Sequence, residues 1–279
     1  MSTPTTTPDH PTTGSTVKRF MALARAETLQ FVRNKTLLIN AAVVPIAFAL
    51  VMYFVQSGND EASKVDAAAT AMEYFLLFAL MFVQYYTVLS MVTTRRDEGV
   101  LKRLRTGESR DVEILSASSF PGAVLTIVFT VVIAVLLMVL GAPGPVNVVP
   151  IIVAVLLGLA VVSGLALVTS GFTKNAEAAQ ITSLPVMVLL FASMGLFRQL
   201  YPEAVTEVVD RTPFALIFDL AQYGWAGNTM MDRISADGAA PLSSGEVLAE
   251  TWQMMLILVV WAVVCLWAGA KYVRWDIRR

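Results

Sequence analysis

Long stretches without charge dominate the pattern of hydrophobic and polar positions along the chain. Five such stretches lack Asp, Glu, Lys and Arg, and they cover residues 36–59, 74–94, 114–173, 178–197 and 251–270. A helix needs about 20 apolar residues to cross a hydrocarbon core that is roughly 30 Å thick. Four of the stretches therefore predict one membrane span each, and the third is long enough to hold two.

The third stretch is divided by residues 141–147, which read Gly-Ala-Pro-Gly-Pro-Val-Asn. This run of Gly and Pro cannot continue a helix, so it predicts a tight turn between two antiparallel spans. The fold class that follows is an all-α membrane protein with six transmembrane helices. The expected spans are about 37–56, 73–94, 116–140, 148–172, 178–197 and 251–270.

Composition supports a membrane protein over a soluble helical bundle. Hydrophobic residues make up 56% of the chain and charged residues only 15%, against about 25% charged in ordinary soluble domains. Residues 1–16 consist mainly of Thr, Pro and Ser without an apolar run, which argues against a cleavable signal peptide. We expect residues 1–16 to be a disordered cytoplasmic tail and residues 17–279 to form one transmembrane domain.

The distribution of Lys and Arg predicts the orientation in the membrane. Of the 20 basic residues, all but four fall on the side that would carry both chain termini, and the four exceptions are Lys64, Arg198, Arg211 and Arg233. Positive residues resist translocation, so the side with 16 basic residues is expected to be cytoplasmic. The net charge of -1 hides this sorting because the two sides cancel.

Residues 17–34 have the periodicity of an amphipathic helix lying along the inner membrane surface. Its polar face carries Lys18, Arg25 and Arg33, and Glu27 interrupts the apolar face. Glu27 either faces a headgroup or an Arg, or contacts a partner protein. The apolar face consists of Val17, Phe20, Met21, Ala24, Thr28 and Phe31.

The segment 95–113 between the second and third spans is the richest in charge, with six basic and five acidic residues. Leu104 lies three residues after Leu101 and four after Val100, a spacing typical of one face of a short amphipathic helix. The segment is either a solvated loop that sets topology or a docking surface for a soluble partner.

Residues 198–250 form the only sizeable outer segment. Two weakly apolar runs, 204–209 and 214–223, are separated by Thr212 and Pro213, and neither is long enough to span. They are either short outer helices between spans five and six that dip into the outer leaflet and cap the bundle, or surface loops.

Several kinds of chemistry are missing from the sequence. The chain has no P-loop motif, no His-Glu-x-x-His motif and no Gly-x-Ser-x-Gly motif. With Cys265 in a span and His10 in the tail as the only cysteine and histidine, we expect no metal site and no catalytic residue. The spans contain no ionisable group, since Glu73 is expected at a span edge facing the outer interface. A self-powered proton-coupled carrier is therefore disfavoured.

Two sets of residues within the spans suit packing or a substrate pathway. Ala154, Gly158, Ala160 and Gly164 give small-x-x-x-small pairs that allow close helix packing. A second set combines mild polarity with adaptable apolar groups, and either lines a cavity or forms hydrogen bonds between helices. It comprises Gln84, Tyr85 and Tyr86 in the second span and Ser183, Met187, Phe191 and Met194 in the fifth.

The order of these elements resembles the type-2 permeases of ATP-binding-cassette (ABC) exporters, which include drug, antibiotic and polysaccharide export permeases. The resemblance covers residues 17 to about 275, and its most specific part is the run Glu-Gly-Val-Leu-Lys-Arg-Leu at 98–104. The chain departs from the family pattern at two places. Val100 occupies a position where relatives often have Thr, and Thr106-Gly107-Glu108 follows Leu104-Arg105 where many relatives have Pro. Further matching features are the runs 23–27, 33–35, 200–205 and 212–214, with Pro45 and Asp219.

The resemblance implies a bacterial multi-pass protein of the plasma membrane, with both termini cytoplasmic and no nucleic-acid partner. Two permease subunits, expected to be a homodimer, would bind two ABC ATPase subunits that hold ATP and Mg²⁺, while this chain binds no cofactor. The N-terminal helix and the 95–113 loop would transmit ATPase movement. The matching coupling positions are Glu27, Arg96, Glu98, Gly99, Leu101, Arg103 and Leu104.

The function that follows is ATP-driven export of an amphipathic drug-like, antibiotic or lipid-like compound. Two alternatives stay open at this point. One is export of a lipid-linked glycan, and the other is a membrane sensor or scaffold that uses the same loop without moving a substrate.

Overall fold

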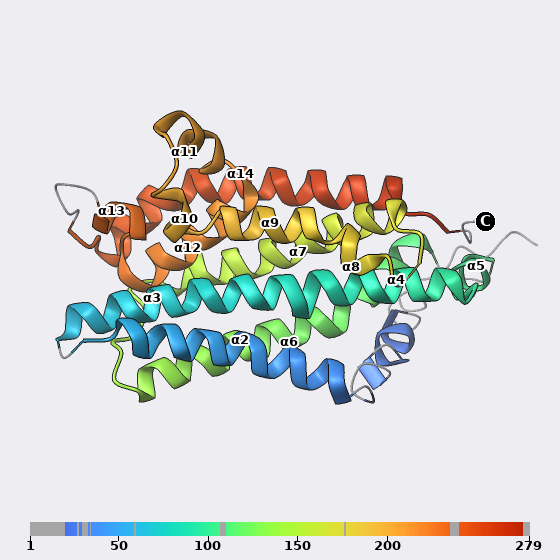
Figure 1. The fold of residues 1–279 in the computed structure, drawn as a ribbon, viewed down its shortest axis with the longest axis horizontal. Helices are drawn as coiled ribbons and strands as arrows, with labels where there is room; N and C mark the ends of the chain where they lie inside the picture. The colour runs from blue at the N-terminus through green and yellow to red at the C-terminus, as the bar shows by residue number, and fades with distance from the viewer. Residues whose placement is uncertain are drawn as a thin grey trace, which may run out of the picture.

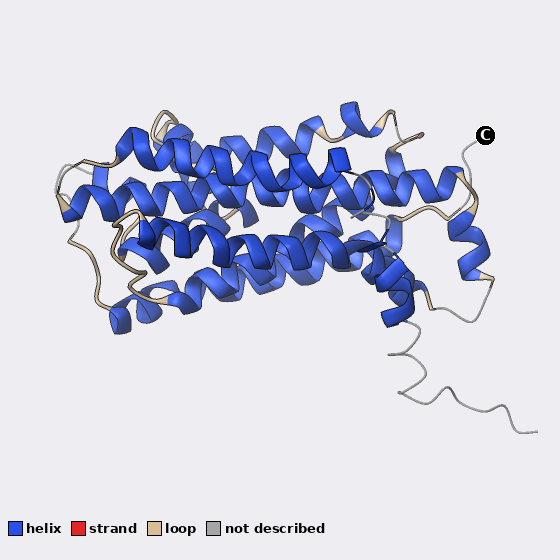
Figure 2. Ribbon diagram, turned by 90° about the horizontal axis from the view of Figure 1, so that it is seen from below, coloured by secondary structure: helices blue, strands red, loops and turns tan. Residues whose placement is uncertain are grey.

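The structure is a computed structural model, and it describes residues 20–26, 28–29, 33, 35–58, 60–106, 110–175, 177–234 and 240–275. Every regular element within these ranges is a helix. Most of the long helices run side by side along the longest axis of the molecule, as both ribbon views show (Figures 1 and 2). The fold class predicted from the charge-free stretches, an all-α bundle, is confirmed.

Five elements run the length of the bundle. Their bounds are α2 Lys35–Gln56, the continuous rod of α3 Glu61–Phe78, η1 Ala79–Tyr86 and α4 Thr87–Asp97, then α6 Asp111–Val139, α7 Val148–Phe172 and α14 Ser244–Tyr272.

The region predicted as the fifth span is broken into three short helices, α8 Ala179–Thr182, α9 Leu184–Ala192 and α10 Gly195–Arg198. By length and composition, the described residues contain four helices able to cross a membrane, Ser63–Asp97, Asp111–Val139, Val148–Phe172 and Ser244–Tyr272. Ala41–Gln56 and Ala179–Ala192 are shorter apolar helices. The count of six spans is compatible with this arrangement and stays a prediction.

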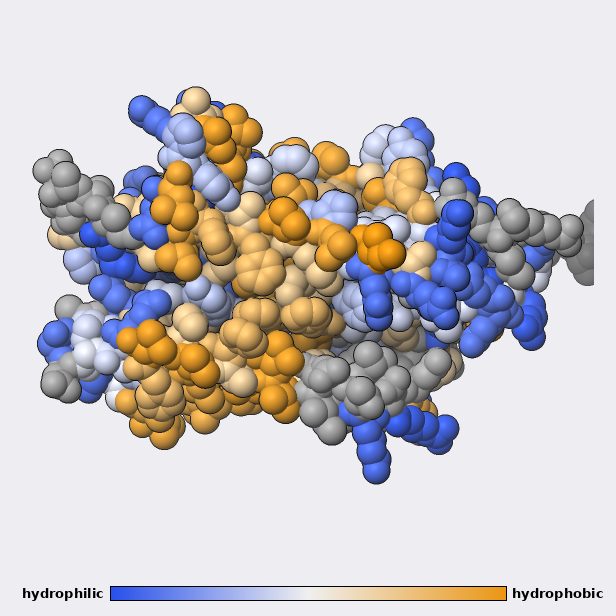
Figure 3. Space-filling model, in the orientation of Figure 1, coloured by the Kyte–Doolittle hydropathy of each residue, from blue (hydrophilic) through white to orange (hydrophobic). Residues whose placement is uncertain are grey.

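Hydropathy divides the surface into zones along the long axis. On the face drawn in Figure 3, hydrophobic residues occupy the middle of the bundle and hydrophilic residues gather at its two ends. One end holds α5 Val100–Arg105, the end of α14 and the first described helical residues, 20–26 (Figure 1). The opposite end holds α11 Glu203–Val209, α12 Pro213–Ala226 and α13 Met230–Ile234. We refer to these as the α5 end and the α12 end.

The outer segment forms helices, and one of them lies inside the protein. The predicted runs 204–209 and 214–223 correspond to α11 and α12, which confirms short helices over surface loops. Every residue of α12 is buried, whereas α11 has no buried residue. Thr212 caps α12 and Pro213 occupies its first turn, where a missing N–H costs nothing. The run of apolar residues in α12 therefore closes one end of the core.

Close packing between α7 and α14 depends on glycine. A Cβ atom added to Gly164 would lie 2.4 Å from the carbonyl carbon of Cys265, and one added to Gly171 would lie 2.3 Å from the carbonyl oxygen of Tyr272. Gly269 of α14 approaches the backbone of Gly164 in the same way. The predicted role of Gly164 in close helix packing is confirmed, because only a residue without a side chain permits these distances.

The helix expected over residues 17–34 is described only in part. Residues 20–26, 28–29 and 33 are helical, Ala24 is buried, and Arg25 is exposed, as the amphipathic pattern predicts. The Phe20 ring contacts the Phe120 ring edge to face at 5.7 Å, which attaches this helix to α6. The predicted disorder of residues 1–16 and the role of Glu27 lie outside the described residues.

Candidate functional site

Three regions bear on function: the surface formed by α5, an apolar cavity beside η1, and a network of buried charges at the α12 end. The α5 surface begins where α4 ends. Gly99 has a φ of +70°, a left-handed conformation that favours glycine, and it is the residue before α5. The chain turns at this glycine, so α5 leaves the axis of α4.

Apolar side chains fix α5 to the bundle while its charged side chains face outward. Leu101 is completely buried, and Leu104 is partly buried against the same core. Glu98, Lys102 and Arg103 are exposed, and the Arg103 guanidinium donates to the Glu98 carbonyl oxygen at 3.1 Å. The predicted amphipathic helix is confirmed. The charged side chains are therefore exposed to the surroundings, while the two leucines hold the helix to the bundle.

Arg96, one of the predicted coupling residues, lies inside the protein. It is 1% exposed, and its guanidinium donates to the carbonyl oxygens of Ser170, Thr173 and Lys174 at 2.7, 2.6 and 3.1 Å. These carbonyls are at the end of α7, where helical partners run out, so Arg96 caps α7. Within the proposed coupling set, Arg96, Leu101 and Leu104 hold the segment in place, and Glu98 and Arg103 are exposed.

The second region is a cavity of about 530 Å³ between α2 and the rod formed by α3, η1 and α4. Phe78, Phe82 and Tyr86 repeat every four residues, a spacing that a π-helix with its wider turn keeps on one side. The Phe48 and Phe78 rings are stacked with centroids 4.2 Å apart. None of the lining residues is ionisable at neutral pH. They are Ala41, Val44, Phe48, Phe78, Phe82, Tyr86 and Thr87.

The predicted pathway residues of the second span divide into two groups. Gln84 is fully buried and donates to the Ser163 hydroxyl at 2.7 Å, and the Tyr85 hydroxyl donates to the Thr169 hydroxyl at 2.9 Å. Both therefore join η1 to α7, which is the packing role that the sequence left open. Tyr86 alone of the three lines the cavity.

The predicted pathway residues of the fifth span lie close to that cavity only through Phe191. The Phe191 ring contacts the Phe78 ring edge to face at 6.1 Å. Ser183 is buried and donates to the Gln180 carbonyl, and it also contacts the sulfur of Met187. Met194 is 1% exposed. Whether these residues contact a substrate stays a prediction.

The third region corrects the prediction for Glu73. The helix expected to begin near residue 73 begins at Glu61, so Glu73 lies in the interior of a long rod and is 1% exposed. Its carboxylate accepts a hydrogen bond from the Gly195 backbone N–H at 2.9 Å and another from the Gln222 side-chain amide. The prediction that Glu73 faces the outer interface is wrong, because the α12 segment folds inward and covers it.

Glu73 belongs to a chain of polar contacts that reaches the end of the bundle. Gln222 accepts a hydrogen bond from Arg233 at 2.9 Å, and Arg233 also donates to the Asn228 side-chain oxygen at 2.9 Å. The Arg233 guanidinium lies 3.5 Å from the Asp66 carboxylate. The Glu73 carboxylate of α3 therefore holds both α10, through Gly195, and α12, through Gln222.

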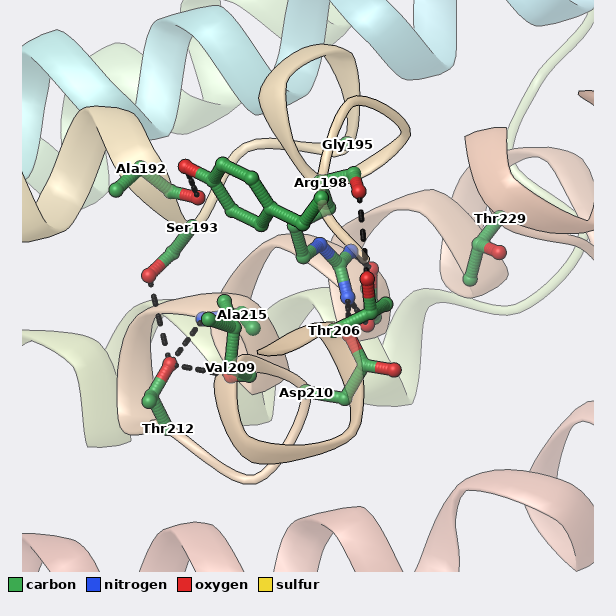
Figure 4. A network of polar contacts seen from close by, with 12 residues as sticks. Ala192, Ser193, Gly195, Arg198, Thr206, Val209, Asp210, Thr212, Ala215 and Thr229 are labelled. Atoms are coloured by element: carbon green, nitrogen blue, oxygen red, sulfur yellow. Dashed lines mark hydrogen bonds and ion pairs between the residues drawn. The ribbon is translucent and has the colours of Figure 1, made fainter. Parts of the chain in front are cut away.

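A buried ion pair holds α10 against α12. Arg198 is 2% exposed and donates to Asp219 of α12. It also donates to Asp210 at 2.6 Å (Figure 4). Burial raises the pKa of the Asp219 carboxyl above its usual value, and the Arg198 guanidinium opposes that rise. The pair thus offsets part of the cost of removing both charges from water.

Sequence reasoning missed the roles of the buried Arg198 and Asp219 and of the partly buried Arg233. Arg198 and Arg233 counted only as two of the four basic residues on the outer side. One signal was available, since Asp219 is an isolated acidic residue within an apolar run and such a residue needs a partner when buried. The identity of that partner depends on the fold of the outer segment.

Comparison with known proteins places the chain in context. The sequence model of a family described as "ABC-2 type transporter" matches residues 18–225, which is most of the chain. The matched region includes the α5 surface, the cavity, and the Glu73 and Arg198 contacts to α12. A search of curated proteins found no match.

Proposed function

The chain belongs to the ABC-2 type transporter family, and from this premise we propose that it is the permease subunit of an ATP-driven exporter. It is a multi-pass membrane protein and the transmembrane component of a transporter. We infer that ATP and Mg²⁺ are bound by two copies of a separate ABC ATPase subunit, and that a second permease subunit completes a homodimer. The expected location is the plasma membrane of a bacterium with both termini in the cytoplasm.

The α5 surface is the single observation that carries this proposal. A short helix after a left-handed Gly99 is held by Leu101 and presents Arg103 outward, and the exposed Glu98 lies just before the turn. A loop that only set topology would need positive charge, but not a buried apolar anchor or a fixed turn. A basic helix that is attached firmly to the bundle and lies beside the exposed, acidic Glu98 suits a surface through which a soluble partner transmits force.

The cargo is inferred from the cavity beside η1. Among the described residues, its walls carry aromatic rings and no side chain that is ionisable at neutral pH, and its volume of about 530 Å³ lies within the usual range for small-molecule sites. Burying a phosphate or a charged sugar against such walls would cost several kcal/mol without a compensating partner. We therefore favour an amphipathic drug-like, antibiotic or lipid-like cargo over a lipid-linked glycan.

The test is to purify the tagged full-length chain from its native membrane and identify what accompanies it. We expect a P-loop ATPase at one copy per permease chain, and ATP-dependent uptake of an apolar fluorescent dye into inside-out vesicles. Co-purification of a kinase or another regulator, with no ATPase and no dye uptake, would instead support the sensor or scaffold. An ATPase without dye uptake would leave the permease assignment in place and contradict the proposed cargo.

A further inference from the structure

The end of α14 is attached to α5 by a contact that no sequence motif indicated. The guanidinium carbon of Arg105, the last residue of α5, lies 4.8 Å from the centre of the Trp275 ring. The same guanidinium lies 3.2 Å from the carboxylate of Asp111, the first residue of α6. Arg105 is thus held between a carboxylate and an aromatic face, the two kinds of group that a planar guanidinium binds best.

The segment that carries Trp275 is itself fixed to the bundle. Val273 follows α14 directly and is only 6% exposed, as part of the apolar core. Trp275 is partly buried against the same core. The ring is therefore held in place by its own packing, and its contact with Arg105 joins two parts of the protein that are far apart in sequence.

α14 is a suitable support because it is fixed along its length. Gly164 and Gly171 of α7 allow its backbone to approach closely, and the Trp261 indole N–H donates to the Arg211 carbonyl at 3.0 Å near the α12 end. A contact between α5 and the segment after α14 therefore attaches α5 to the helix pair α7 and α14, which has the most extensive contact in the described bundle.

We propose that Trp275 is a positioning residue that holds α5 through Arg105, and that the C-terminal segment 273–275 thereby forms part of the surface presented to the ATPase. The second half of this statement rests on the proposed function. Trp275 acts on the partner through Arg105 and the orientation of α5, with no role in binding nucleotide.

The first arm of the test needs no ATPase. Hydrogen exchange of the α5 amides is measured on the full-length chain in lipid nanodiscs. We expect Trp275→Ala to raise the exchange rate over residues 100–106 by about two- to five-fold, the factor expected from loss of an exposed cation–π contact. Trp275→Phe keeps an aromatic face and should stay close to wild type. Unchanged exchange in Trp275→Ala would overturn the proposal.

A matched control is available on the same helix. Lys271 lies 4.8 Å from the Trp267 ring, a cation–π contact formed entirely within α14, and Trp267 is 60% exposed. Trp267→Ala removes an aromatic residue of the same kind from the same region without touching α5. It should leave exchange over residues 100–106 unchanged. If Trp267→Ala raised the exchange rate over residues 100–106 as much as Trp275→Ala, the cause would be a general loosening of α14. That result would contradict a specific role of Trp275 in holding α5.

The second arm measures ATPase stimulation after reconstitution with the co-purified ATPase. Trp275→Ala and Arg105→Gln should each reduce stimulation, their double variant should lose no more than the stronger single one, and Trp275→Phe should restore most of it. Faster exchange with full stimulation would overturn the role in docking. If the wild-type chain binds no ATPase, the proposed function fails, and with it the proposal that segment 273–275 belongs to the ATPase-binding surface. The exchange measurement alone then decides whether Trp275 positions α5.

Discussion

Two pairs of charged side chains at opposite ends of the bundle differ in their surroundings. At the α12 end, Arg198 and Asp219 are buried and form an ion pair with each other. At the α5 end, Glu98 and Arg103 are exposed, and leucines provide the attachment. Both ends connect consecutive helices, and each is rich in charge.

The difference shows how to separate a charge that holds structure from one available to a partner. A charge removed from water must be paired where it lies, so its loss weakens the fold. An exposed charge on an apolar anchor adds little to stability and is free to bind elsewhere. Substitutions of the buried charges at the α12 end should therefore reduce stability, and substitutions of Glu98 and Arg103 at the α5 end should affect only coupling.

The largest effect on stability is expected for Arg198→Ala. Removing the guanidinium leaves Asp219 buried without its partner, which should lower the free energy of unfolding by about 3–5 kcal/mol. Unfolding in mixed micelles measures this change. The control is Arg211→Ala, which breaks an exposed pair with Glu207 and should cost less than about 0.5 kcal/mol. Equal losses in the two variants would refute the contrast between buried and exposed pairs.

A smaller loss is expected for Glu73→Ala. The substitution leaves the Gly195 N–H and the Gln222 amide without their acceptor, at a cost of about 1–3 kcal/mol. Glu73→Gln keeps one oxygen acceptor at nearly the same volume and should recover part of that loss. The same unfolding assay applies. A stability of Glu73→Ala equal to that of wild type would mean that the carboxylate does not anchor α10 and α12.

In the turn before α5, a cost in stability is expected for substitution of Gly99. Alanine there would be forced into the left-handed region, which costs about 1–2 kcal/mol, although no atom lies within 4 Å of the added Cβ. Gly245→Ala is the control, because that glycine also has open space but lies in the first turn of α14 with a normal φ. A neutral Gly99→Ala would show that the turn before α5 relaxes freely.

Much of the fold could be predicted from the sequence, because each prediction used information local to one segment. Charge-free length located the long helices, Pro and Gly located the turn at 141–147, and the spacing of Leu101 and Leu104 located α5. The breaks in the fifth region were not visible, since Leu184–Ala192 is as apolar as a continuous span.

What the sequence left undetermined depends on contacts between distant segments. Glu73 is 122 residues from Gly195 and 149 from Gln222, so its burial follows from how the outer segment folds back. Arg96 reads as one of several basic residues in a loop, and its role as a cap becomes visible only with the end of α7 beside it. In the candidate site, the sequence therefore pointed to individual residues, but it did not predict their burial or their hydrogen-bond partners.

The central claim is that exposed charge on α5 transmits force from a separate ATPase. The most direct measurement is ATPase stimulation in reconstituted vesicles by Arg103→Glu, beside Arg211→Glu, an exposed arginine at the α12 end. We predict that Arg103→Glu, like Glu98→Lys, abolishes stimulation with membrane insertion intact and stability within about 0.5 kcal/mol of wild type, whereas Arg211→Glu stimulates normally. Full stimulation by Arg103→Glu and Glu98→Lys would contradict the claim.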